Sequence, residues 1–185
     1  LIYMNNILKK YKKVALSNKQ ILDLVNDKAN IVLYPSLYKF STIDQLLYPY
    51  NACFLLFETK PKFGHWCAII KYGNTIEFFD SYSGYPDDVL NYIPDDFKKI
   101  SNQNYPYLTK LLLDSPYNIE FNDHKYQKYN TNISTCGRHS ALRILYKNLN
   151  LKQYDKLIKK LCKITNTDPD TLVTYLTLII NKGKF

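Results

Sequence analysis

The sequence predicts an α+β fold in which helices pack against a small, mixed, mostly antiparallel sheet. Apolar runs at 52–58, 65–72 and 75–80 follow one another with only short polar connections, which is typical of consecutive antiparallel strands. The segments before and after them instead carry apolar residues at helical spacing behind capping residues. A chain of 185 residues can bury one sizeable core, so we expect a single domain over 1–185.

The N-terminal part is expected to be mainly helical. Residues 1–16 form a basic amphipathic arm. Ser17 is a suitable N-cap for a helix over 19–27, whose apolar stripe would be buried. The elements expected before the first long strand are an apolar run and one short helical turn, at 31–34 and 42–47.

The middle of the chain predicts a three-stranded antiparallel unit. A turn-like polar segment joins the first two strands, and Gly73–Asn74 makes a tight turn into the third. His65 begins the second strand and Asp80 ends the third. Because the start of one hairpin strand lies beside the end of the next, His65 and Asp80 should be neighbours.

Helices dominate the remainder. The expected elements are, in order, a short helix at 86–92, a fourth strand at 117–121, a buried helix at 136–148 and two C-terminal helices within 151–185. The last of these follows Asp168, a capping residue, with Pro169 at the first helical position.

Composition excludes several classes of protein. Hydrophobic residues make up 46% of the chain, which argues against disorder throughout. No uninterrupted apolar run approaches the ~20 residues that span a bilayer, so no membrane partner is expected. The first residues are too polar for a secretory signal. The cysteines form no CxxC pair and predict free thiols in a reducing compartment; they are Cys53, Cys67, Cys136 and Cys162.

The net charge is +9, and lysines gather at 9–13 and again at 156–163. Two solvated helix faces explain this pattern better than a dedicated DNA groove, because charge alone gives only non-specific affinity. Non-specific binding of DNA to the basic surface is nevertheless an expectation.

Cys136 is the candidate nucleophile. It stands between a polar run and an apolar-periodic segment, hence at the first turn of a helix, where unpaired N–H groups and the helix dipole favour an anion. A thiol held there loses its proton more readily, and the thiolate is the reactive form. Most helical cysteines are packing residues, an interpretation that fits Cys53, Cys67 and Cys162 better than Cys136.

A cysteine hydrolase also needs a base, a group that orients the base, and donors for the oxyanion. We assign His65 as the base and Asp80 as the group that fixes its ring. Gln127 would donate to the oxyanion beside the backbone N–H of Cys136. Gly137 would let a substrate approach the start of the helix closely.

Two other histidines are rival bases. His139 lies three residues after Cys136 on the same helix, where we expect no facing element to orient it. His124 lies in a polar loop beside a carboxylate and ranks below His65. His65 and Cys67 could begin a metal site, but they alternate across a strand and no second pair has ligand spacing, so no metal is expected.

The order His65-Trp66, Asp80-Ser81, Gln127, Cys136-Gly137 resembles the adenovirus-type maturation proteases. Their relatives include ubiquitin-like-protein deconjugases and proteases of other large DNA viruses, virophages and related transposons. The resemblance spans about residues 17–150 and implies a papain-like core with His-Asp-Gln-Cys order.

The chain departs from this pattern in two places. Gln127 lies nine residues before Cys136, whereas the family usually has a shorter gap, so Asn130 or Asn132 is an alternative oxyanion donor. The C-terminal helices from Leu151 onward and the first 16 residues have no clear counterpart.

The resemblance implies a cysteine endopeptidase that processes capsid or other virion precursor proteins at small-residue, Gly-rich sites. Trp66 would then form part of a narrow substrate channel. No cofactor is required, and activation by DNA or a peptide is known in the family. We expect a monomer acting in the virion and the host-cell interior, in the viral factory. The alternatives are a ubiquitin-like-protein deconjugase with the same chemistry, and a non-catalytic basic DNA-binding or scaffold protein in which Cys136 is a relic.

Overall fold

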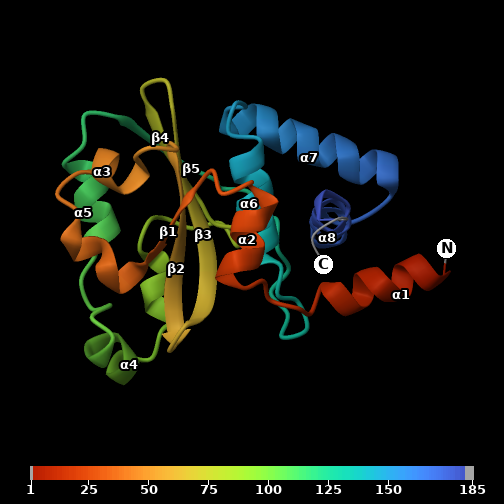
Figure 1. The fold of residues 1–185 in the computed structure, drawn as a ribbon, viewed down its shortest axis with the longest axis horizontal. Coiled ribbons are helices and arrows are strands. Elements are labelled where there is room, and N and C mark those ends of the chain that lie inside the picture. Colours follow the sequence, from red (N-terminus) through yellow and green to blue (C-terminus); the bar gives the residue numbers. More distant parts are fainter. Residues whose placement is uncertain (1, 182–185) are drawn as a thin grey trace.

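The computed structural model describes residues 2–181, with a five-stranded mixed sheet at its centre (Figure 1). Leu1 of the predicted arm and residues 182–185 of the predicted C-terminal segment lie outside the described residues. The strands are arranged in sequence order, namely β1 (Asn30–Leu33), β2 (Ala52–Lys60), β3 (Phe63–Tyr72), β4 (Thr75–Phe79) and β5 (Asn118–Phe121). The three central strands are antiparallel, and each edge strand is parallel to its neighbour. The predicted α+β class and mixed sheet are confirmed.

Helices cover both faces of the sheet (Figure 1). One face carries short elements, namely η1 (Tyr34–Lys39), α3 (Ile43–Leu47), η2 (Asp88–Tyr92) and α5 (Tyr107–Leu113). The other face carries α2 (Asn18–Leu24) and α6 (Cys136–Leu145). Successive residues of β3 alternate between the two cores, so Trp66 and Ala68 face α6 while Cys67 and Ile69 face the opposite core.

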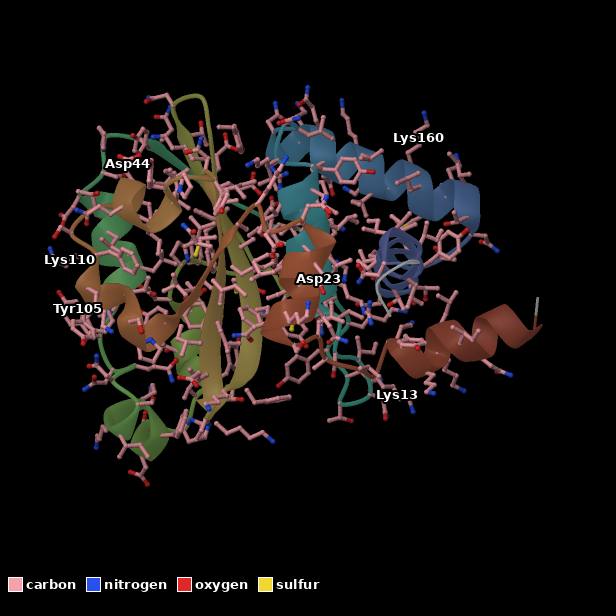
Figure 2. The ribbon with its side chains drawn as sticks, in the orientation of Figure 1. Lys13, Asp23, Asp44, Tyr105, Lys110 and Lys160 are labelled. Carbon is pink, nitrogen blue, oxygen red and sulfur yellow. The ribbon has the colours of Figure 1, made fainter. Side chains whose placement is uncertain are left out.

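Three further helices form a layer outside α6, namely α1 (Ile2–Tyr11), α7 (Leu151–Thr165) and α8 (Pro169–Ile180). In Figure 1, α8 lies between α7 and α1, on the side of α6 away from the sheet. Lys160 on α7 and Lys13 just after α1 lie at opposite edges of the molecule in Figure 2. Within residues 2–181, no helix combines the length and the apolar character that crossing a bilayer requires.

Capping residues account for the best-predicted helix starts. Ser17 forms a reciprocal capping box with Gln20 at the start of α2, and the Asp168 side chain caps α8. Helix α2 nevertheless ends at Leu24 rather than at the predicted residue 27, because Asn26 and Asp27 adopt positive φ angles of 52° and 56°.

Two α-helices of the described residues were not predicted from the sequence, α4 (Asp95–Ile100) and α5. Their N-cap positions are occupied by Pro94 and Pro106, which make no side-chain capping bond. Both helices therefore lack a capping side chain, and only α4 has acidic residues in its first turn, Asp95 and Asp96, to mark its start.

Candidate active site

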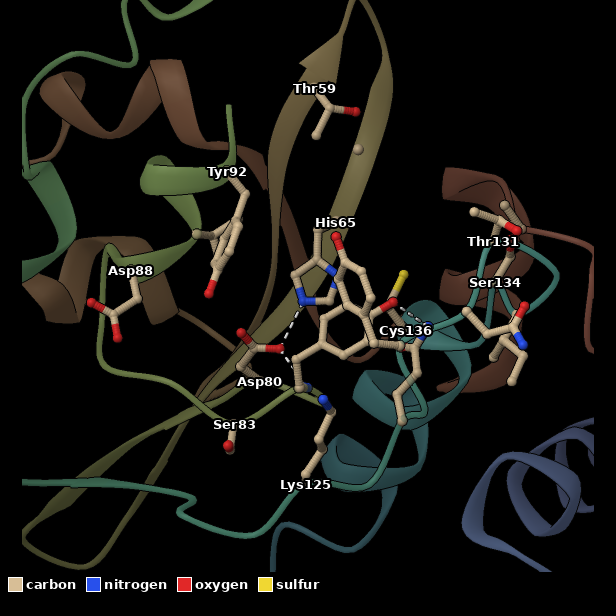
Figure 3. Close-up of a pocket in the computed structure, with 18 of the residues that line it drawn as sticks. Thr59, His65, Asp80, Ser83, Asp88, Tyr92, Lys125, Thr131, Ser134 and Cys136 are labelled. Atoms are coloured by element: carbon tan, nitrogen blue, oxygen red, sulfur yellow. Dashed lines mark hydrogen bonds and ion pairs between the residues drawn. The ribbon is translucent and has the colours of Figure 1, made fainter. Parts of the chain in front are cut away.

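The four predicted catalytic residues line one cleft of about 570 Å³ (Figure 3). His65 comes from the start of β3 and Asp80 from the end of β4. Cys136 is the first residue of α6, and Gln127 lies in the connection between β5 and α6. The fold therefore brings together side chains from four separate segments of the sequence.

The start of β3 lies unusually close to β2. A Cβ added to Gly64 would lie 1.8 Å from the carbonyl oxygen of Phe57, so only glycine fits this position. The adjacent His65 directs its Nε2 to Oδ1 of Asp80 at 2.7 Å, with its side chain 12% exposed. The predicted proximity of these two residues is confirmed.

Asp80 is held from both sides. Its backbone N–H donates to the side-chain oxygen of Asn122 at 2.9 Å, and the Asn122 amide donates back to the Asp80 carbonyl oxygen at 2.6 Å. The backbone N–H of Tyr82 donates to Oδ1 of Asp80 at 2.8 Å. Burial alone would raise the pKa of Asp80, but the charge and hydrogen bond of His65 and the Tyr82 N–H hold it below its usual value.

His65 is set up to carry a positive charge. Burial by itself would lower its pKa, but the Cys67 sulfur, the Asp80 carboxylate and a hydrogen bond to Cys136 raise it well above the usual value. The ring of Tyr82 stacks on His65, with centroids 4.9 Å apart and planes inclined by 23°. Because Asp80 engages Nε2, the ring nitrogen left for Cys136 is Nδ1.

The pKa of the Cys136 thiol is shifted in the opposite direction from that of His65. Burial raises its pKa, but the hydrogen bond and charge of His65 and the backbone N–H groups of Trp66 and Gly137 bring it below the usual value. The residue lies at the N-terminus of α6 and is 9% exposed. A lowered pKa at the thiol and a raised one at its histidine partner together favour a thiolate–imidazolium pair.

Gln127 is fixed by a second set of polar contacts. Its Oε1 accepts from the Ser81 hydroxyl at 2.8 Å, its Nε2 donates to the Tyr82 hydroxyl at 2.9 Å, and it is 2% exposed. One Nε2 hydrogen therefore remains available for an oxyanion. The nucleophile loop, residues 128–135, follows directly. In this loop Asn130 lines the cleft and accepts from the Asn132 backbone N–H at 2.8 Å, whereas Asn132 does not line it.

Trp66 and Gly137 do not line the cleft. Trp66 is 5% exposed and meets Phe54 edge to face. A Cβ on Gly137 would lie 3.3 Å from Trp66 Cδ1 and from Ile21 Cγ2, so this glycine lets α6 approach the core closely. Their contact with a substrate stays a prediction.

Neither rival histidine shares the cleft with Cys136. His139 is completely buried, and its Nε2 lies 3.1 Å from Oδ1 of Asp170 on α8. The expectation that no facing element would orient His139 is therefore wrong, because the unforeseen α8 carboxylate does so. The His124 ring meets Tyr126 edge to face at 4.9 Å, outside the cleft.

Among the described residues, one group of three potential metal ligands comes together. The ligand atoms of His65, Cys67 and Asp80 all lie within 4.8 Å of one another. The placement of His65 and Cys67 across the strand was wrong, because residues two apart share a face. Burial and then the Asp80 charge raise the pKa of Cys67 to about 12, so a metal ion would have to displace a tightly held proton from this thiol.

Comparison with known proteins identifies the family. No protein-family model matches the chain. The uncharacterized protein V9 of Sputnik virophage is 51% identical over 172 residues, which cover 92% of this chain and 98% of that protein. The chain belongs to the V9 family. At this identity and coverage, the V9 relative and this chain share one fold over nearly their whole length.

A likeness among solved structures is much looser. The C-terminal protease domain of Ulp1, solved in complex with Smt3, the yeast orthologue of SUMO, is 16% identical with a TM-score of 0.39. The similarity covers 91% of this chain and 78% of the Ulp1 chain. A likeness at this level carries no inference about chemistry, so any function of this V9-family chain must be argued from its own site.

Sequence reasoning missed three residues that shape this site. Tyr82 packs on the histidine ring, Asn122 joins the ends of β4 and β5, and Asp170 contacts the nucleophile loop from α8. Only Tyr82 carried a signal, since it lies two residues after Asp80. Asn122 and Asp170 are polar residues in ordinary turn and cap contexts, and only the tertiary fold shows their partners.

Proposed function

We propose that this V9-family chain is a cysteine endopeptidase. The observation that carries the proposal is the hydrogen-bonded His65–Asp80 pair, which lines one cleft together with Cys136 at the N-terminus of α6. The Cys136 thiolate attacks the carbonyl carbon of a peptide bond while Asp80 holds the His65 ring. Protonated His65 then gives its proton to the leaving amine, and an acyl-thioester remains on the sulfur.

The second half of the reaction uses the same residues. Neutral His65 takes a proton from a water molecule, whose oxygen attacks the thioester carbonyl and releases the acid and the thiolate. In both halves, negative charge develops on the carbonyl oxygen. The backbone N–H of Cys136 and the free Nε2 hydrogen of Gln127 are the donors we assign to it.

The substrates we propose are capsid or other virion precursor proteins with small residues at the cleavage site. The viral V9 relative supports a viral role. We further propose a monomer without a required cofactor, acting in the virion and the host-cell interior, with DNA or a peptide as its activator. Purified capsid precursors, ubiquitin-like fusions and Gly-Gly peptides, each with and without DNA, form the test panel. Cleavage of the ubiquitin-like fusions alone would favour deconjugation, and cleavage of none would favour a scaffold.

Selective alkylation tests the nucleophile without any knowledge of the substrate. We expect iodoacetamide at neutral pH to modify Cys136 first, because its lowered pKa keeps the sulfur ionised. Cys162 is the internal control, since it is half-buried with a raised pKa. Mass spectrometry of the folded protein identifies the labelled residue. Modification of Cys162 ahead of Cys136 contradicts the assignment.

Removal of the Gln127 side chain tests the oxyanion donor. Gln127→Ala is expected to lower kcat by on the order of 10²–10³ with KM little changed, since the donor acts on charge that develops only in the transition state. Asn130→Ala is the matched control, because Asn130 lines the same cleft and we expect its kcat to be unchanged. A loss confined to Asn130→Ala would transfer the role to that residue. Steady-state kinetics on one peptide compares the variants.

A further inference from the structure

A single carboxylate on α8 holds both ends of the nucleophile loop. Oδ2 of Asp170 accepts a hydrogen bond at 3.0 Å from the backbone N–H of Lys128, which directly follows Gln127. Oδ1 accepts one at 2.6 Å from the hydroxyl of Thr135, which directly precedes Cys136. The two ends of the loop are thus tied to one point on a helix that is distant in the sequence.

The carboxylate itself lies inside the protein, although Lys128 is exposed. Asp170 and Thr135 are both 0% exposed, and His139 adds a third hydrogen bond to the carboxylate. Burial raises the pKa of Asp170, but its bonds to His139, Thr135 and Lys128 bring it below the usual value. An ionised carboxylate is retained at such a position only when its partners compensate the lost hydration, so the three bonds act together.

The bond to Asp170 also changes what Thr135 does for α6. Thr135 occupies the N-cap position of this helix but makes no capping bond to it, because its hydroxyl points to Asp170 instead. A capping threonine would normally accept from a backbone N–H in the first turn. The first N–H groups of α6 therefore stay available for the Cys136 sulfur and for an oxyanion.

The N-terminal arm supports the same loop. The carbonyl oxygen of Lys12 accepts from the backbone N–H of Ser134 at 2.8 Å. The Lys12 ammonium donates to the Thr171 hydroxyl at 3.0 Å and lies 3.6 Å from Asp168, so the arm also binds the start of α8. The first 16 residues and the C-terminal helices, which have no counterpart in the adenovirus-type proteases, therefore both contact the nucleophile loop.

We propose that Asp170 is a positioning residue, through which catalysis by Cys136 depends on the docking of α8. The inference rests on the proposed peptidase function. The unusually long spacing between Gln127 and Cys136 leaves a loop that needs an external anchor, and Asp170 supplies it. A displacement of about 1 Å in a catalytic group lowers the rate by on the order of 10²-fold.

Asp170→Asn removes the charge and keeps the shape. An amide has one oxygen, so its NH₂ faces either the Lys128 N–H or the groups at the Oδ1 position. In the second case Thr135 keeps its contact only if its hydroxyl turns to accept, and in both cases the negative charge that strengthens the three bonds is lost. On a fluorogenic Gly-Gly peptide we expect kcat to fall by on the order of 10²-fold with KM within about twofold, because positioning and not binding is lost.

Three further variants separate positioning from general stability. Thr174→Val is the matched control, because the buried Thr174 hydroxyl bonds only the Asp170 carbonyl oxygen, at 2.7 Å, within α8. It weakens the same helix without touching the loop, and its kcat should equal the wild-type value. Thr135→Val should lose turnover, whereas Thr135→Ser keeps the hydroxyl and should retain it.

The outcomes that overturn the inference are wild-type kcat in both Asp170→Asn and Thr135→Val, or an equal loss in Thr174→Val. If the wild-type protein cleaves no peptide, the peptidase proposal fails, and the alkylation rate of Cys136 by iodoacetamide then decides the inference alone. A several-fold slower rate in Asp170→Asn or in Thr135→Val than in the wild-type protein supports the positioning role. Equal rates in all three proteins overturn it.

Discussion

Cys136→Ala is expected to abolish peptide cleavage, with a loss in kcat on the order of 10⁶-fold, while the fold is retained. The alanine removes only the sulfur atom that forms the acyl intermediate. His65→Ala should cause a similar loss, because the imidazole both polarises the thiol and protonates the leaving amine. The Cys136→Ala/His65→Ala double variant should be no worse than either single variant, since residues that act as one unit are strongly non-additive.

Steady-state kinetics and thermal unfolding of the same preparations check this result. Cys162→Ser is the matched control, because Cys162 lies on α7 away from the cleft and should keep wild-type turnover. Substantial cleavage by Cys136→Ala would remove the nucleophile assignment. Additive losses in the double variant would show that the two side chains do not act together.

The sequence predicted those features that local chemistry controls. Ser17 and Asp168 indicate helix starts because their side chains accept hydrogen bonds from backbone N–H groups only three residues later. The hairpin that brings His65 beside Asp80 follows from strand alternation and one tight turn. The antiparallel centre of the sheet and the His65–Asp80 contact were therefore predictable from strand alternation and short turns.

The remainder depends on contacts between distant segments. In the sequence, Asp170 is an acidic residue in the first turn of a predicted helix, a position that acidic residues commonly occupy because of the helix dipole. Its partners, Lys128 and Thr135, are about 40 residues earlier in the chain. The sequence does not show that α8 packs on α6. For this reason neither the anchoring of the nucleophile loop nor the burial of His139 could be predicted.

A buried ion pair secures the opposite end of α6. Arg143 donates from Nε and from one terminal nitrogen to the two carboxylate oxygens of Glu77, both at 2.7 Å, and both side chains are 0% exposed. Arg143 also donates to the carbonyl oxygens of Tyr146 and Leu149, at 2.9 and 2.8 Å. The pair therefore fastens α6 and the turn after it to the middle of β4.

Glu77→Gln is expected to lower the free energy of unfolding by about 3–5 kcal/mol, because it leaves Arg143 as an uncompensated buried charge. Urea and thermal unfolding measure the change, which corresponds to a fall in Tm of about 10 °C. Glu120→Gln is the matched control. The Tyr72 hydroxyl lies 2.9 Å from an oxygen of each glutamate, but Glu120 is exposed, so its replacement should change stability by less than about 0.5 kcal/mol.

A double variant distinguishes the pair from a simple loss of packing. Glu77→Gln combined with Arg143→Met should recover part of the lost stability, because neither charge then remains buried and unpaired. The molecules of Glu77→Gln that remain folded should keep wild-type kcat. The end of α6 that carries Cys136 is bound to Asp170 through Thr135, and this contact does not involve Glu77 or Arg143. A loss below about 1 kcal/mol in Glu77→Gln would mean that the other contacts of Arg143 already compensate its charge.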